Sequence, residues 1–80
     1  MQAIFIQVKC ELGRAYDVAA EAVDSIEAVS EVYSTSGMYD LLVKCYLPRD
    51  ADVGRFVTGS IQTLPGVKDT YTIITFNAFT

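Results

Sequence analysis

The sequence predicts a single α+β domain over residues 1–80, with the element order β-α-β-β-α-β, and three observations support this order. Hydrophobic residues alternate in four segments, as they do in half-buried strands, and recur at three- and four-residue steps in two others, as they do in amphipathic helices. Eighty residues are the length of one small domain. Two internal echoes, Val8–Leu12 with Val43–Leu47 and Ile26–Ser34 with Leu64–Thr72, indicate two similar β-α-β halves. This is the ferredoxin-like plan.

The first half of the chain predicts a strand, a helix and a strand. Residues 3–10 alternate between an apolar face and a mixed face, and this period of two is typical of a strand that ends before Gly13. Over residues 14–27, apolar residues recur at helical spacing opposite a row of acidic residues, which indicates an amphipathic helix. Residues 29–35 form the second predicted strand.

The second half opens with the third predicted strand, from Tyr39 to Leu47. Pro48 ends this strand because proline cannot donate a hydrogen bond to a ladder. Asp50 or Asp52 then caps a second helix with its side chain. An apolar stripe supports that helix, made of Val53, Phe56, Val57, Ile61 and Leu64.

The second helix and the last strand are the least regular parts of the pattern. Gly54 and Gly59 lie inside the helix, and each costs about 1 kcal/mol of helix propensity relative to alanine. Pro65-Gly66 ends the helix, and the fourth strand is predicted from Tyr71 to Phe79. The last strand is apolar on both sides, so the pattern leaves its register open.

The predicted sheet has one face that two helices cannot cover. The repeat places the first and third strands side by side in the middle of the sheet. Phe5, Leu42 and Tyr46 share the uncovered register with two lysines, and one register of Ile73, Ile74 and Phe76 joins them. Exposed apolar patches of this kind usually mark interfaces. We therefore expect a dimer in which two sheets pack through their open faces, with Phe5, Leu42, Tyr46 and Phe76 in the contact.

Composition argues against several classes of function. No apolar run approaches the roughly 20 residues of a membrane span, and the N-terminus lacks a basic region, so we expect a cytoplasmic protein without a membrane partner. The net charge is −4, and the six basic residues are scattered rather than gathered in a patch that would neutralise phosphates. Direct binding to nucleic acid is therefore not expected.

Catalysis and metal binding also find little support. The chain has no histidine, and its many Ser and Thr residues have no evident partner that would activate a nucleophile. Cys10 and Cys45 hold equivalent places in the repeat on the core-facing register, which predicts two buried thiols rather than a metal site or a disulfide. We predict no catalytic residue, no metal and no cofactor.

The segment between the second and third strands is the best candidate for a binding site. Gly37 can adopt φ > 0 in a tight bend, and Asp40 follows where an apolar strand begins. Asp40 either caps the turn with its carboxylate or faces outward to hold a cation. A free amino acid carries an ammonium and a carboxylate, and the bend offers groups for both. The bend contributes the candidates Thr35, Ser36, Gly37, Met38, Tyr39 and Asp40.

Two motifs together resemble the effector-binding domain of the Lrp/AsnC regulators, also called the RAM domain. The first is the Gly-x-x-Asp bend, from Gly37 to Asp40, and the second is Pro-Gly-Val followed by Thr-x-Thr, from Pro65 to Thr72. In that family the effector amino acid lies where dimers meet. The resemblance therefore implies that residues 37–40 form one wall of the site, and that Thr70 and Thr72 are polar candidates on or near the other.

The resemblance is to the stand-alone version of the domain, because the first strand follows Met1 directly and no helix-turn-helix precedes it. It implies dimers joined into an octamer or a similar ring, with a free amino acid as ligand. Such a domain senses amino acids by itself or assembles with full-length Lrp/AsnC regulators, and the sequence leaves both open. Two alternatives share the fold plan: a small dimeric α/β-barrel enzyme of the monooxygenase or isomerase type, and an ACT-type amino-acid sensor.

Overall fold

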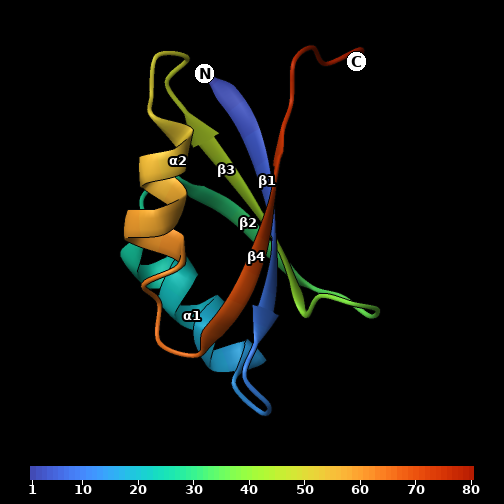
Figure 1. Cartoon of the computed structure of the whole chain (residues 1–80). Coiled ribbons are helices and arrows are strands. Elements are labelled where there is room, and N and C mark those ends of the chain that lie inside the picture. Colours follow the sequence, from blue (N-terminus) through green and yellow to red (C-terminus); the bar gives the residue numbers. More distant parts are fainter.

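The computed structural model describes residues 1–80 and has the predicted element order (Figure 1). Both helices lie on one side of a four-stranded sheet, and the C-terminal segment leaves the sheet at the end opposite the loop between β1 and α1. The elements are β1 (Gln2–Cys10), α1 (Ala15–Ser25), β2 (Val29–Ser34), β3 (Leu41–Leu47), α2 (Val53–Phe56), the π-helical turn η1 (Val57–Ile61) and β4 (Val67–Ile74).

The sheet is antiparallel with the strand order β2-β3-β1-β4, which confirms the prediction that the first and third strands are central. β1 and β3 pair from Gln2 opposite Leu47 to Val8 opposite Leu41. Residues that lie opposite each other in an antiparallel pair point to the same face of the sheet. This register places the alternating apolar residues of both central strands on the helix-covered face.

The core lies between the sheet and the helices. Its strand residues are almost completely buried, and α1 and η1 contribute Val18, Val57 and Ile61 to the same cluster. Each fully buried aliphatic side chain contributes about 1.5–3 kcal/mol relative to an exposed one. The strand residues of the core are Ile4, Ile6, Val8, Cys10, Leu41, Val43, Cys45 and Leu47.

Asp52, one of the two predicted caps, begins the second helix by accepting a hydrogen bond from the Arg55 N–H at 3.0 Å. The α-helical part is only four residues long, and a π-helical turn continues it. Thr58 and Thr63 donate their hydroxyl protons to backbone carbonyls one turn earlier, at 3.0 and 2.8 Å. Such side-chain bonds compete with regular helical bonding, so this element is less regular than α1.

The predicted bounds of the fourth strand, Tyr71–Phe79, are wrong. β4 begins immediately after Gly66 and ends at Ile74, which lies opposite Ile4 near the start of β1. Because β1 begins at Gln2, little partner strand remains beyond that point, and residues 75–80 adopt no regular structure. The first residues of β4 are mostly polar, so the pattern of hydrophobicity did not indicate where this strand begins.

β4 contains a bulge at its first residues. Lys9 lies opposite Asp69, but Cys10 lies opposite Val67, so Lys68 is an extra residue without a partner in the register. Bulges of this kind redirect one side chain out of the strand's alternation. The pairing also decides the register that the sequence left open: Ile73 lies opposite Phe5, on the uncovered side, and Ile74 lies opposite Ile4.

We call the uncovered side of the sheet the open face. It combines half-buried and exposed apolar side chains with an ion pair between Lys44 and Glu31 at 3.7 Å. The Lys44 ammonium also lies 6.0 Å from the centre of the Phe5 ring and 5.1 Å from that of Tyr46. The apolar residues of the open face are Phe5, Tyr33, Leu42, Tyr46, Tyr71 and Ile73.

Candidate functional site

The bend between β2 and β3, residues 35–40, is closed by Thr35. Its N–H donates to the Asp40 carbonyl at 2.9 Å, and its hydroxyl donates to the Tyr39 carbonyl at 3.1 Å. Gly37 has φ of 109°, a conformation that residues with a Cβ rarely adopt. Ser36 and Met38 are exposed at the tip, and the Met38 side chain is 82% exposed. Glycine therefore permits the bend, and Thr35 holds it.

Asp40 joins the bend to the end of β1. Its carboxylate Oδ2 accepts a hydrogen bond from the Cys10 N–H at 2.7 Å, and its own N–H donates to the Val8 carbonyl at 2.9 Å. The carboxylate thus caps a neighbouring strand rather than its own turn. No protein donor contacts Oδ1, so one oxygen of this carboxylate is free to bind another group.

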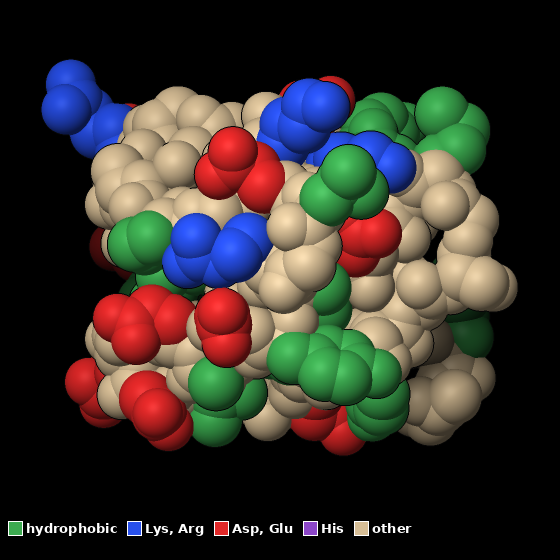
Figure 2. All heavy atoms as spheres, turned by 90° about the horizontal axis from the view of Figure 1, so that it is seen from below, with side chains coloured by type: hydrophobic (Ala, Val, Ile, Leu, Met, Phe, Trp, Pro, Cys, Tyr) green, Lys and Arg blue, Asp and Glu red, His purple; other side chains and the backbone are tan.

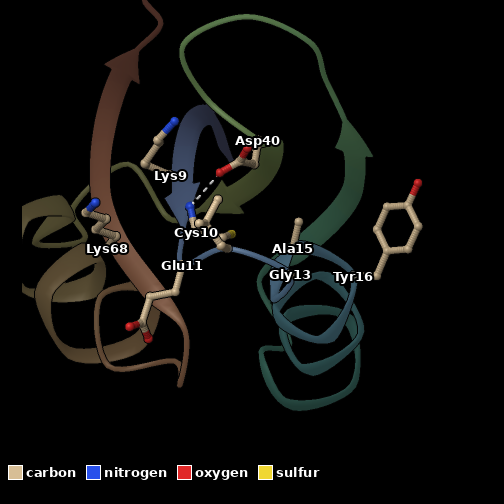
Figure 3. Close-up of a pocket in the computed structure, with 9 residues that line it drawn as sticks. Lys9, Cys10, Glu11, Gly13, Ala15, Tyr16, Asp40 and Lys68 are labelled. Carbon is tan, nitrogen blue, oxygen red and sulfur yellow. Dashed lines mark hydrogen bonds between the residues drawn. The ribbon is translucent and has the colours of Figure 1, made fainter.

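A cavity of about 340 Å³ lies beside Asp40, and we call it the β1-end cavity (Figure 3). Residues 9–13 at the end of β1, Ala15 and Tyr16 at the start of α1, Asp40 and Lys68 line it. The volume is within the range of small-molecule sites, about 300–1,000 Å³. The cavity therefore has room for a small metabolite.

A second hollow of about 400 Å³ lies beside the same two lysines, since Lys9 and Lys68 line both. Met38 and Tyr39 of the bend and Asp69 of β4 complete it. The Tyr39 ring also lies 6.3 Å, centre to centre, from Tyr71. The bend is thereby brought next to the first residues of β4.

Thr70 and Thr72 lie elsewhere. Thr72 is opposite Ile6 on the helix-covered side, and the Thr70 hydroxyl accepts a hydrogen bond from the Gln62 side chain at 2.8 Å. Neither residue lines the hollows beside the bend. The structure therefore brings residues 38–40 together with Lys68 and Asp69 of β4, but it does not bring the two threonines there.

Several lining residues were not singled out by the sequence analysis. They are Lys9, Glu11, Leu12, Tyr16 and Lys68. The predicted pairing of the first and third strands was a usable signal for the first three, because it places the start of the third strand beside the end of the first. Nothing in the pattern of hydrophobicity marked the bulge that directs Lys68.

The four residues expected in a dimer contact lie on or next to the open face. Phe5, Leu42 and Tyr46 are on it, and Phe76 follows the end of β4 with its side chain 84% exposed. A hollow of about 450 Å³ is lined by Phe5, Tyr46 and Phe76 among others. Three of the expected contact residues thus border one depression.

The two cysteines are free buried thiols, which confirms that prediction. Burial raises the pKa of the Cys45 thiol from 9.0 to about 11. Burial and then the Asp40 carboxylate raise the pKa of Cys10, and Lys9 opposes them. Both side chains therefore stay protonated and apolar at neutral pH. No three His, Cys, Asp or Glu side chains cluster as metal ligands do, and no helix is long and apolar enough to cross a membrane.

Solved structures show the same fold. The protein TTHA0845 from Thermus thermophilus superposes with a TM-score of 0.87 at 31% identity, over 100% of this chain and 99% of that one. A transcriptional regulator from Neisseria meningitidis, solved as a complex with L-Met, superposes with a TM-score of 0.84. It is 19% identical, the match covers 99% of this chain and 52% of that one, and the likeness is one of fold.

Sequence relatives point to the same family. The helix-turn-helix transcriptional regulator FL11 from Pyrococcus abyssi is 36% identical over 70 residues, which cover 88% of this chain and 45% of the regulator. The chain thus spans about half the length of the curated relatives it matches. Residues 3–80 match the family described as the Lrp/AsnC ligand binding domain. With this match over nearly its whole length and the shared fold, the chain belongs to the Lrp/AsnC ligand binding domain family.

Proposed function

We propose that this domain is an amino-acid sensor that acts by binding and self-association rather than by catalysis. A free amino acid binds at the bend, with its ammonium on the Asp40 carboxylate. Copies of the chain pair through their open faces, and the ligand lies where such dimers meet. Ligand binding then favours one assembly over another through its differential affinity for the two.

The observation that carries the proposal is the state of Asp40. One carboxylate oxygen is held by the Cys10 N–H, which fixes the direction of the side chain, and the other has no protein donor and borders the β1-end cavity. A fixed carboxylate with one free oxygen is suited to an ammonium group. The regulator of the same fold that was solved with L-Met agrees with a ligand of this class.

Exposed apolar side chains support contacts between dimers at this end of the molecule. Leu12, Tyr16 and Met38 are 101%, 77% and 82% exposed, and all three border the two hollows. Figure 2, which views the molecule from below, shows hydrophobic side chains among acidic and basic ones. A contact with another copy would cover these side chains and remove their apolar surface from water. Leu12 and Tyr16 lie outside the open face, so a contact through this end would add a second surface for self-association to the one proposed for the open face.

The arrangement of the core favours binding over the enzyme alternative. In a dimeric α/β-barrel enzyme, the pocket lies between the helices and the sheet. Here that space is filled by the cluster of eleven buried hydrophobic residues. The hollows that border Asp40 lie at the end of the sheet instead.

Light scattering behind a sizing column tests the proposal, with the protein alone and with a mixture of the common amino acids. We expect assemblies of eight or more 8.8-kDa subunits whose distribution shifts when the ligand is present. A dimer that ignores every amino acid would remove the sensor function. A second arm adds a full-length Lrp/AsnC regulator, and co-elution would show that the domain assembles with that regulator.

A further inference from the structure

We infer that the β1-end cavity selects a neutral amino acid with an apolar side chain, and that Lys9 and Lys68 hold its carboxylate. The inference rests on the proposed amino-acid sensor and deepens it by naming the ligand class and the carboxylate-binding pair. Four observations carry it: two lysines outside any ion pair, a free carboxylate oxygen, balanced charges, and an exposed apolar rim.

The two lysines come together although they belong to different strands. Lys9 is near the end of β1, and Lys68 is the extra residue of the bulge in β4. Figure 3 shows them on adjacent strands at one side of the cavity. Three of the other basic residues form ion pairs, Arg14, Lys44 and Arg55, but neither of these two does. Two neighbouring ammonium groups without a protein anion are suited to the two oxygens of a carboxylate.

Asp40, which lies away from the two lysines, faces the other end of the ligand (Figure 3). Asp40 presents its free Oδ1, and Glu11 lines the same cavity from the turn after β1. The α-ammonium and α-carboxylate of an amino acid are separated by one carbon. A cavity of about 340 Å³ with Lys9 and Lys68 on one side and Asp40 at the bend can contact both groups at once.

The balance of charges indicates the net charge of the ligand. Two lysines and two carboxylates line the cavity, so its side chains sum to zero at neutral pH. A zwitterion keeps that balance. An additional charge on the ligand's side chain would have to leave water without a counter-charge left for it among this chain's lining residues, and this costs affinity.

The rim of the cavity indicates that the ligand's side chain is apolar. Leu12 is 101% exposed and Tyr16 is 77% exposed, and both border the cavity together with Ala15. An apolar side chain on the ligand would cover these groups and remove their surface from water. A polar side chain would gain nothing there, so leucine and methionine are the natural probes.

Isothermal titration calorimetry with the full chain tests the inference. The probes are leucine, methionine, lysine and aspartate, together with leucinamide, which lacks the carboxylate, and 4-methylpentanoate, which lacks the ammonium. Leucine or methionine is expected to bind at least about tenfold more tightly than every other probe. Leucinamide and 4-methylpentanoate each lose a charged contact, and lysine and aspartate each add an uncompensated charge.

The variants Lys9→Met and Lys68→Met remove one charge each and keep an unbranched apolar stem. Each is expected to weaken leucine binding about tenfold or more, whereas Arg55→Met, which removes a charge from α2, is expected to leave it unchanged. Thermal melts of all three verify that they are folded.

The outcomes separate the two proposals. Tighter binding of a charged amino acid, or wild-type affinity for leucine in both lysine variants, would overturn the selectivity proposed here while the sensor function stands. If the wild-type chain binds none of the four amino acids and its assembly also ignores the mixture in light scattering, the sensor function fails and the selectivity fails with it.

Discussion

The structure gives Asp40 one role and we propose a second, and two substitutions distinguish them. Its carboxylate accepts the Cys10 N–H at 2.7 Å, which stabilises the end of β1, and its second oxygen is proposed to bind the ligand's ammonium. Asp40→Ala removes both contacts. Asp40→Asn keeps a carbonyl oxygen for the Cys10 N–H and removes the negative charge.

The expected loss of folding stability in Asp40→Ala follows from the environment of this hydrogen bond. Hydrogen bonds to charged groups contribute about 1.5–3 kcal/mol, and a buried N–H left without an acceptor costs about 1–3 kcal/mol. Cys10 is 5% exposed, so water replaces the lost acceptor poorly. We expect Asp40→Ala to lower the free energy of unfolding by about 2 kcal/mol, and to lower Tm by about 8–16 °C in a domain of this size. Asp40→Asn should cost about 1 kcal/mol or less, because a neutral hydrogen bond remains.

Urea unfolding and calorimetry with leucine provide the assays, at one protein concentration because self-association adds to apparent stability. Both variants are expected to lose at least about tenfold in affinity, whereas only Asp40→Ala loses much stability. An unchanged urea midpoint in Asp40→Ala would refute the argument that this hydrogen bond stabilises β1. Wild-type affinity in Asp40→Asn would refute the argument that charge holds the ammonium.

Three further predictions concern the open face, the glycines and the buried thiol. Leu42→Glu places a charge in the open face and is expected to yield monomers in sedimentation velocity, whereas persisting dimers would place the contact elsewhere. Gly66→Ala is expected to cost about 3 kcal/mol in urea unfolding, and Gly37→Ala about 1–2 kcal/mol. Both have positive φ, but only at Gly66 would a Cβ lie 3.0 Å from a valine methyl of α1, so equal costs would contradict this reasoning. Stability is expected to fall as pH rises from about 9 toward 11, because the unfolded chain releases the Cys45 proton at lower pH than the folded chain does. The urea midpoint of Cys45→Ala should decline less over that range, and a parallel decline would exclude this thiol as the cause.

The central part of the fold could be predicted because its residues obey one simple period. The alternation in β1 and β3 is strict, and the echo between the two halves placed these strands side by side. The fourth strand was misplaced because it lies at the edge and its first residues are polar. Its true bounds depend on where β1 begins, and that is a tertiary constraint which no local pattern contains.

The candidate site was predictable on one side only. Gly37 and Asp40 were visible because a glycine bend followed by an acid at the start of an apolar strand is unusual. The partner of the Asp40 carboxylate is a backbone N–H thirty residues earlier. Every residue except proline has this group, so the residue types in the sequence could not identify the partner. Lys68 was not visible because a bulge depends on how two strands pair, and not on the composition of either.

The bulge in β4 has a consequence for how such domains change ligand over evolution. Loss of the single codon for Lys68 would leave Val67 opposite Cys10 and Asp69 opposite Lys9 in regular pairing, and every other side chain would keep its face of the sheet. One cation would disappear from the cavity while the core stayed the same. If Lys68 binds the ligand as proposed, a one-residue deletion would therefore change the recognised charge while the buried residues of the core stay the same.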